Sequence, residues 1–270
     1  MMKKIIIANW KINPSITKEA TALLNSTSQT AGKIKNFKKE IDLIICPPFI
    51  YLSDLKTKKL KNIKLGAQNC FWEDRGAYTG EISPLMLKNL GVEYVIIGHS
   101  ERRNHIRESD EMIAQKIKAV FENKLTPILC VGETLEQRGR GIEKNIVQEQ
   151  LKKDLKEVKN LKNKTLIIAY EPVWAIGTGN YCQPEEALEM IKFIKEIINL
   201  NFNLPVLTAQ TDSEKSLKVL YGGSVDSKNV TSYVKYQEID GALVGGASIK
   251  INEFQKLINE VSRTAETSSA

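Results

Sequence analysis

Leu166-Ile167-Ile168-Ala169-Tyr170 is a continuous apolar run that ends at Glu171 and Pro172. An apolar run without polar alternation is typical of a parallel strand that is buried on both faces. Proline cannot donate to a strand ladder, and it holds the residue before it in an extended conformation. We therefore expect a buried strand at 166–170 that stops at Glu171.

Similar short apolar runs occur seven more times along the chain. They lie at 5–8, 41–46, 63–67, 94–97, 127–131, 219–221 and 242–244. Parallel strands need long connections, which are usually helices. Two of the intervals between runs show apolar residues at helical spacing. Ser109 is a good N-cap for the first of these helices, and Pro184 is a favoured first-turn residue for the second.

Alternation of eight β and α units predicts a (β/α)₈ barrel, in which eight parallel strands are surrounded by a ring of helices. An open doubly wound sheet usually has fewer strands and often carries a glycine-rich fingerprint after the first one. Here the first run is followed by Asn9-Trp10-Lys11 instead. We expect one domain over residues 1–261, followed by a flexible tail of small and polar residues at 262–270.

The composition, with 42% hydrophobic and 26% charged residues, is that of a globular protein. A net charge of +7 could attract an anionic partner, but the lysines are spread over several stretches with few aromatic residues between them. Solvated helix faces are the simpler interpretation, so we expect no nucleic-acid and no membrane partner. The four cysteines are widely spaced, which predicts reduced thiols and no metal site. No apolar run is long enough for a signal-peptide core or a transmembrane helix, so we expect a cytoplasmic location.

The active site of such a barrel forms where the carboxyl ends of the strands meet. Glu171 follows the sixth run, His99 follows the fourth, and Asn9 and Lys11 follow the first. We interpret Glu171 as a base that acts on a small phosphorylated substrate. If Ser100 begins a helix, the positive end of that helix disfavours protonation of His99, and a neutral ring can donate a hydrogen bond to a carbonyl oxygen. Lys11 would supply a fixed positive charge.

The segment after Glu171 is apolar and is bounded by a proline and by glycines. Its residues are Pro172, Val173, Trp174, Ala175, Ile176, Gly177, Thr178 and Gly179. Exposed apolar side chains would be unusual here unless the loop folds over something. The segment at 172–179 therefore predicts a lid that excludes water from the site.

Glycine-rich turns follow the seventh and eighth runs, at Gly222-Gly223-Ser224 and Gly245-Gly246. Backbone N–H groups that no Cβ atom obstructs bind anions well. Loops after strands seven and eight are also where barrels of this kind usually bind phosphate. Together the two turns predict a phosphate site.

The chain resembles the triosephosphate isomerase family in stretches that run in order through nearly its whole length. These stretches are ANWK (8–11), AQN (67–69), GAYTGEIS (76–83), VIIGHSERR (95–103), CVGET (130–134), AYEPVWAIGTG (169–179), YGGSV (221–225) and LVGGA (243–247).

The resemblance implies interconversion of dihydroxyacetone phosphate and D-glyceraldehyde 3-phosphate through an enediolate, without a metal or an organic cofactor. It implies that Glu171 is the general base, that His99 is a neutral electrophile and that Lys11 stabilises negative charge. Glu101 would pair with Lys11, and Ser100 would lie beside it. The residues that would contact the substrate, the last four through its phosphate, are Asn9, Gly177, Ser224, Gly245 and Gly246.

The resemblance also implies a homodimer, in which a projecting loop at 68–82 enters the partner subunit. Gln68, Asn69 and Thr79 would contact the partner, with Thr79 near the other active site. The segment at 201–216 and the tail after residue 261 match the family least well. No motif residue lies in either of them.

Two alternatives remain at this point. An aldolase-like barrel enzyme would need a lysine with a lowered pKa inside a strand, and none of the eight runs has an obvious one. A polyanion-binding or surface-binding role would produce strongly salt-dependent binding. Such binding could coexist with catalysis.

Overall fold

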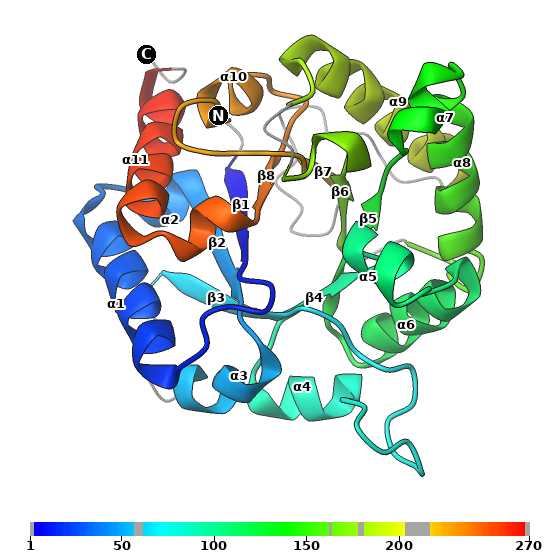
Figure 1. Ribbon diagram of the computed structural model, residues 1–270, viewed down its shortest axis with the longest axis horizontal. Coiled ribbons are helices and arrows are strands. Elements are labelled where there is room, and N and C mark those ends of the chain that lie inside the picture. The colour runs from blue at the N-terminus through cyan, green and yellow to red at the C-terminus, as the bar shows by residue number, and fades with distance from the viewer. Residues whose placement is uncertain (1–2, 57–61, 162–163, 178–180, 203–216, 268–270) are drawn as a thin grey trace.

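The computed structural model describes residues 3–56, 62–161, 164–177, 181–202 and 217–267, without the side chains of 265–267. Within these residues, eight parallel strands pair in sequence order, and β1 also pairs with β8, so the sheet closes into a barrel (Figure 1). The strands are β1 Lys4–Asn9, β2 Ile41–Cys46, β3 Ile63–Ala67, β4 Tyr94–Ile97, β5 Thr126–Val131, β6 Leu166–Tyr170, β7 Leu217–Tyr221 and β8 Gly241–Val244.

The predicted fold is confirmed, because each apolar run forms one strand of the barrel. Four runs match their strands residue for residue, and the others start or end at most two residues away. The largest difference is at β7, where Leu217 and Lys218 extend the predicted run. A lysine interrupts the apolar pattern there, so the sequence rule missed the start of the strand.

Helices surround the barrel, as Figure 1 shows. The α-helices are α1 Thr17–Lys33, α2 Phe37–Glu40, α3 Phe49–Lys56, α4 Pro84–Leu90, α5 Ser100–His105, α6 Asp110–Glu122, α7 Leu135–Gly139, α8 Glu143–Asp154, α9 Pro184–Phe202, α10 Val230–Val234 and α11 Ile251–Thr267. Short 3₁₀ helices lie at Val173–Ala175 and Gly246–Ile249. None of the described helices is long and apolar enough to cross a membrane.

Both helix starts that the sequence predicted are confirmed. The Ser109 side chain accepts a hydrogen bond from the backbone N–H of Met112 at 3.3 Å, and this caps α6. Helix α9 begins at Pro184, as expected for a residue that has no N–H to leave unpaired in the first turn.

The C-terminal tail was predicted to start too early. Helix α11 continues to Thr267, and the Ser262 hydroxyl, in a side chain that is only 4% exposed, donates to Glu40 Oε2 at 2.8 Å. Small polar residues suggested a frayed end, but Leu257, Ile258 and Val261 carry a buried helical stripe to this point. Residues 268–270 lie outside the described residues.

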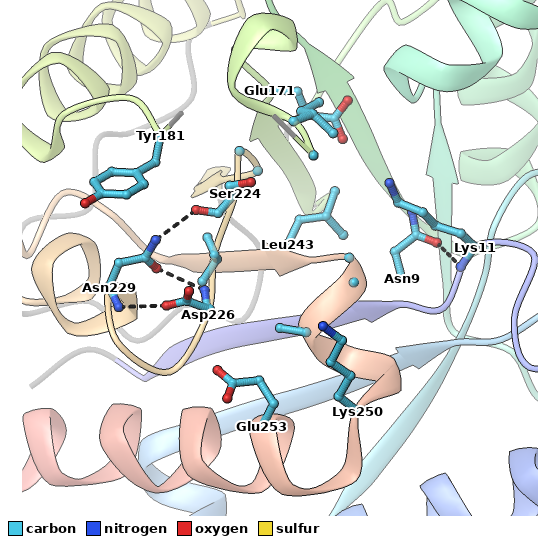
Figure 2. A pocket seen from close by; sticks show the side chains of 18 of the residues that line it. Asn9, Lys11, Glu171, Tyr181, Ser224, Asp226, Asn229, Leu243, Lys250 and Glu253 are labelled. Carbon is cyan, nitrogen blue, oxygen red and sulfur yellow. Dashed lines mark hydrogen bonds between the residues drawn. The ribbon is translucent and has the colours of Figure 1, made fainter. Parts of the chain in front are cut away.

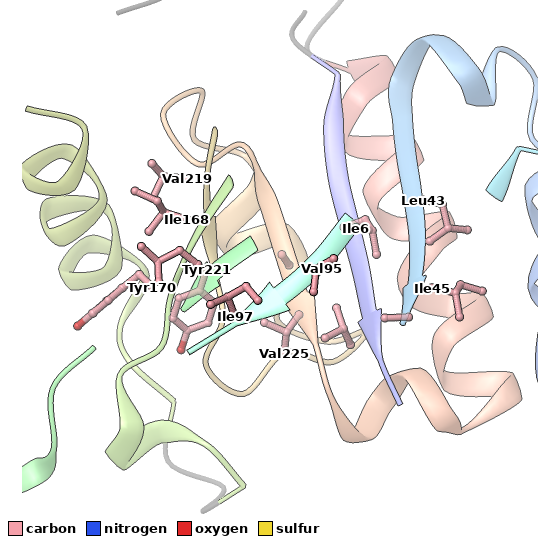
Figure 3. Close-up of a cluster of buried hydrophobic side chains, with 14 of the residues drawn as sticks. Ile6, Leu43, Ile45, Val95, Ile97, Ile168, Tyr170, Val219, Tyr221 and Val225 are labelled. Carbon is pink, nitrogen blue, oxygen red and sulfur yellow. The ribbon is translucent and has the colours of Figure 1, made fainter. Parts of the chain in front are cut away.

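Buried apolar side chains form two clusters, which lie on opposite faces of the sheet. The larger one joins outward strand residues, such as Ile168 and Tyr170, to the surrounding helices (Figure 3). The buried residues of the smaller one, which include Ile167 and Ala169, all come from strands, so this cluster fills the barrel. Successive side chains of a strand point to opposite faces, and β6 therefore alternates between the two clusters.

The same alternation aims the residues that follow the strands. In β6 the inward series is Ile167 and Ala169, and Glu171 continues it by one more step. In β1 the inward residues Ile5 and Ile7 lead in the same way to Asn9. The alternation of side chains along a strand thus directs these polar side chains toward the barrel axis, at the carboxyl ends of the strands.

Candidate active site

A pocket of about 580 Å³ opens at the carboxyl ends of the strands. Figure 2 shows Asn9 and Lys11 on the right of the pocket, Glu171 at the top, and the loop after β7 on the left. The predicted site residues that the structure brings together here are Asn9, Lys11, His99, Glu171, Gly177, Ser224, Gly245 and Gly246. Of the predicted lid, Thr178 and Gly179 lie outside the described residues.

The Glu171 carboxylate is buried at the end of β6, with 1% of the residue exposed. Its Oε2 accepts a hydrogen bond from the backbone N–H of Ser100 at 3.0 Å. Its Oε1 lies 3.2 Å from His99 Nε2 but accepts no hydrogen bond from the described residues. One carboxylate oxygen is therefore held in place while the other keeps its lone pairs available.

Two glycines make room for Glu171. A Cβ atom at Gly132 would lie 1.8 Å from the carbonyl oxygen of Glu171, and one at Gly222 would lie 2.9 Å from its Cγ. Any side chain at Gly132 would therefore displace the backbone of Glu171. Gly132 belongs to the stretch CVGET (130–134), but the sequence predicted no role for it, although its position directly after β5 was a signal that could have found one.

The thiol of Cys130 lies on the inner face of the barrel beside Glu171. Burial, together with the charge of the Glu171 carboxylate, raises the pKa of this thiol well above its ordinary value. Cys130 therefore stays a neutral thiol and adds no second negative charge next to the Glu171 carboxylate.

The His99 ring caps the start of α5. Its Nδ1 accepts a hydrogen bond from the backbone N–H of Glu101 at 3.2 Å. A ring nitrogen that accepts a hydrogen bond carries no proton, so the proton of the neutral ring is on Nε2. That nitrogen faces Glu171 and can donate to an oxygen in the pocket.

The backbone of Lys11 adopts a left-handed conformation, with φ of 54°, which is uncommon for a residue that is not glycine. Two hydrogen bonds hold it there: its N–H donates to Asn9 Oδ1 at 3.0 Å, and its carbonyl accepts from Gln68 Nε2 at 2.8 Å. The ammonium group pairs with Glu101 Oε1 at 2.5 Å. A Cβ atom at Gly245 would come within 3.1 Å of the Lys11 side chain, which places the second glycine turn beside this cation.

The first half of the predicted lid is tied to Glu133, which is fully buried. Trp174 Nε1 donates to Glu133 Oε1 at 2.8 Å, and the hydroxyl of Tyr170 lies 3.1 Å from both carboxylate oxygens. The carboxylate thus anchors the loop after β6 to the loop after β5. Glu133 lies within one of the quoted motifs, but the sequence predicted no role for it. Its contact with Trp174 joins residues 41 positions apart, which a local pattern does not record.

Charged residues that the sequence analysis missed line the outer part of the pocket. They are Asp226, Lys228, Lys250 and Glu253. Asp226 Oδ1 accepts from the backbone N–H of Lys228 at 2.8 Å, and Glu253 Oε1 accepts from that of Ser227 at 2.7 Å. Both carboxylates therefore shape the loop after β7. Nothing in their sequence context marks them, since isolated charged residues after a strand are common.

The three residues predicted to contact a partner subunit have different surroundings. Thr79 is exposed on the loop between β3 and α4, which projects from the body of the molecule in Figure 1. Gln68 donates to the carbonyls of Lys11 and Cys46 within its own chain, and its predicted contact with a partner stays a prediction. Asn69 is 7% exposed and accepts from Lys116 Nζ at 2.9 Å. The last two support the loop from inside.

Three strands carry a lysine, and only Lys64 lies inside one of the predicted runs. Lys64 pairs with Asp42, and this contact outweighs burial and raises the lysine pKa above its ordinary value. Lys218 lies 3.7 Å from Asp240. Burial lowers the pKa of Lys4 to about 8, but its ammonium group donates to backbone carbonyls near the start of β8. None of the three lines the pocket, so none is placed as an aldolase lysine would be.

Comparison with known proteins agrees with this geometry. The family model described as triosephosphate isomerase matches residues 4–261. The triosephosphate isomerase of Clostridium tetani is 43% identical over 260 residues, which cover 96% of this chain and 97% of that protein. The triosephosphate isomerase of Dictyoglomus turgidum is 44% identical over 266 residues, which cover 96% of this chain and 99% of that protein. The chain therefore belongs to the triosephosphate isomerase family.

Proposed function

We propose that Glu171, His99 and Lys11 carry out the interconversion of dihydroxyacetone phosphate and glyceraldehyde 3-phosphate, which is the reaction of this family. The observation that carries this assignment is the contact of 3.2 Å between Glu171 Oε1 and His99 Nε2, in a pocket that Lys11 also lines. A base, a hydrogen-bond donor and a cation thus converge on a space open to a small substrate.

The Glu171 carboxylate removes a proton from the carbon beside the substrate carbonyl, and the electron pair of that C–H bond moves toward the carbonyl oxygen. His99 Nε2–H donates a hydrogen bond to this oxygen as it becomes negative, and the Lys11 ammonium offsets the same charge. In the resulting enediolate, the hydroxyl on the first carbon gives up its proton and the former carbonyl oxygen gains one, a transfer that the neutral His99 ring can carry. Glu171 returns the other proton to the neighbouring carbon, which gives the second triose phosphate. Glu171 serves both steps because its Oε1 has no competing hydrogen bond from the described residues.

The substrate phosphate binds between the two glycine turns. Ser224, Gly245 and Gly246 line the pocket there, and Gly177 also lines it. Backbone N–H groups in such turns suit an anion, and the Lys11 side chain next to Gly245 adds a positive charge. This arrangement supports a binding mode with the phosphate beside the glycine turns and the reacting carbons near Glu171.

The segment at 172–179 acts as the lid. Water would protonate or divert an enediolate, and exclusion of water also strengthens the electrostatic contacts of His99 and Lys11. The bond from Trp174 to Glu133 supports this proposal, because it fixes where the segment leaves the barrel.

The protein functions as a homodimer. Large apolar side chains are exposed on the loop after β1, on the loop after β3 and on the first turn of α4: Ile12 is 95% exposed, Tyr78 46% and Met86 57%. The side chain of Gln68, at the start of the loop after β3, binds the carbonyl of Lys11 next to Ile12 and so joins the first two of these loops. Apolar surface of this kind marks a protein contact. Each subunit forms one catalytic domain, and the unpaired cysteines suit a cytoplasmic location.

The test is the reaction of dihydroxyacetone phosphate in ²H₂O, followed by proton NMR. Glu171 exchanges its proton with solvent, so the product should carry deuterium at the carbon that receives the returned proton. The result that would contradict this role of Glu171 is isomerisation without deuterium in either the product or the recovered substrate. Deuterium would have to be absent at both low and high conversion. A purified wild-type protein with no isomerase activity would contradict the assigned site as a whole.

A further inference from the structure

Tyr233, which the catalytic proposal does not use, connects two parts of the site from behind. It lies on α10 and is fully buried. Its hydroxyl donates a hydrogen bond to the backbone carbonyl of Cys182 at 2.6 Å. Its ring stacks on that of Tyr221, with 4.0 Å between the centroids and 14° between the planes.

Cys182 marks the point where the chain from the lid rejoins the rest of the fold. It is fully buried and lies three residues after Gly179 and two before the start of α9. Its neighbour Tyr181 lines the pocket and is half-exposed. The hydrogen bond from Tyr233 therefore holds the carbonyl next to a residue of the pocket wall.

Tyr221 marks the point where β7 enters the phosphate-binding turn. A Cβ atom at Gly223 would lie 2.3 Å from the Tyr221 hydroxyl oxygen, so this side chain packs directly under the turn. Stacking on Tyr233 fixes the back of the Tyr221 ring. One side chain thus contacts Tyr221, which packs under the turn, and Cys182, which lies three residues after the lid segment.

We propose that Tyr233 is a positioning residue, which fixes the chain at the end of the lid relative to the phosphate-binding turn after β7. This inference rests on the proposed function of the turn and the lid. The phosphate lies far from the reacting carbons, and its binding energy accelerates the reaction only if the groups around it are held in place. Through one rigid ring, Tyr233 holds both the Cys182 carbonyl and the ring of Tyr221.

The decisive variant is Tyr233→Phe, which keeps the ring and leaves the buried carbonyl of Cys182 without its donor. We expect kcat/KM for D-glyceraldehyde 3-phosphate to fall by about 5-fold to 30-fold, the range that corresponds to the loss of one buried hydrogen bond. For D-glyceraldehyde, which has the same reacting carbons and no phosphate, we expect kcat/KM to change less than about 2-fold. The share of turnovers that release inorganic phosphate should rise, since a displaced lid exposes the enediolate.

Tyr236→Phe is the matched control. It removes a tyrosine hydroxyl three positions away, which donates to Glu185 at 2.9 Å and lies at the surface, and both substrates should react as in the wild type. A merely structural role of Tyr233 would lower the folded fraction and reduce both kcat/KM values equally, and that result would overturn the proposal. Unchanged kinetics of Tyr233→Phe with the phosphorylated substrate would also overturn it. These outcomes differ from a failure of the proposed function. In that case the wild-type protein itself would not isomerise the triose phosphate.

Discussion

Glu171 is a buried carboxylate whose two oxygens have different surroundings. The backbone N–H of Ser100 fixes Oε2, whereas Oε1 faces His99 without a hydrogen bond from the described residues. An isolated buried charge is costly, and an oxygen that lacks a partner is normally avoided in a protein interior. Such an oxygen in a pocket is expected where the substrate itself completes the site.

Glu171→Gln should therefore abolish most of the activity while the protein still folds. The amide has the same size but cannot take a proton, so kcat should fall by about 10²-fold to 10⁴-fold. The measurement is a coupled isomerase assay, combined with circular dichroism to confirm the fold. Glu136→Gln is the control, because the Glu136 side chain is 84% exposed on α7 and should not matter. A folded Glu171→Gln protein with wild-type kcat would exclude Glu171 as the base.

Lys4 should make stability depend on pH in the alkaline range. Its pKa is about 8 in the folded protein and 10.5 ordinarily, so the unfolded chain binds more protons between these values. The contribution of Lys4 to the free energy of unfolding is therefore lowest below pH 8. It rises by up to about 3 kcal/mol as the pH increases from 8 to 10.5.

The measurement compares urea unfolding of the wild type and Lys4→Met at pH 8 and at pH 10. The wild type should gain stability relative to Lys4→Met when the pH is raised from 8 to 10. Lys3→Met is the control, because Lys3 forms a partly exposed ion pair with Asp42. A pH-independent difference for Lys4→Met would show that its pKa is not lowered.

At the scale of elements, helix α6 shows how a local signal sets a boundary. Ser109 adopts an extended conformation and caps the helix, and acidic Asp110 and Glu111 occupy the first turn. The cap satisfies a backbone N–H that has no partner within the helix, and the negative charges suit the positive helix end. Both effects are encoded within four residues, so the sequence predicted them.

Ser109→Ala should destabilise the protein by about 1 kcal/mol, the usual effect of removing an N-cap. Urea unfolding followed by circular dichroism measures this change. Ser53→Ala, on the exposed face of α3, should change stability by less than about 0.5 kcal/mol. An equal effect of the two substitutions would mean that the hydrogen bond to Met112 contributes nothing.

At the scale of the whole molecule, the exposed apolar side chains predict association of two subunits. Met86 lies in the first turn of α4, where an aspartate is locally favourable because of the helix dipole. Met86→Asp should therefore leave the subunit folded, while its buried charge weakens the dimer.

Sedimentation velocity at micromolar concentration should show a dimer for the wild type and a larger monomer fraction for Met86→Asp, with lower specific activity. Leu135→Asp is the control, since Leu135 is 68% exposed on α7, away from the projecting loop (Figure 1). A fully active wild-type monomer would contradict the proposed dimer. Equal dissociation of both variants would place the interface elsewhere.

The sequence by itself determined the barrel and the residues at its rim. Apolar runs mark the strands because parallel strands are buried on both faces, and strand period then directs Asn9 and Glu171 inward. These are local properties, since each depends on residues that are adjacent or two apart. The glycine turns were predictable for the same reason.

Only the tertiary structure decided which residues support that rim. Gly132 makes room for Glu171, Glu133 holds Trp174 across 41 positions, and Tyr233 holds Cys182 across 51. Asn69 turns inward to Lys116, and α11 continues through the predicted tail. These contacts depend on which loops the closed barrel brings side by side. No local pattern records that proximity, because it arises only when strands that are distant in the sequence pair, as β5 pairs with β6.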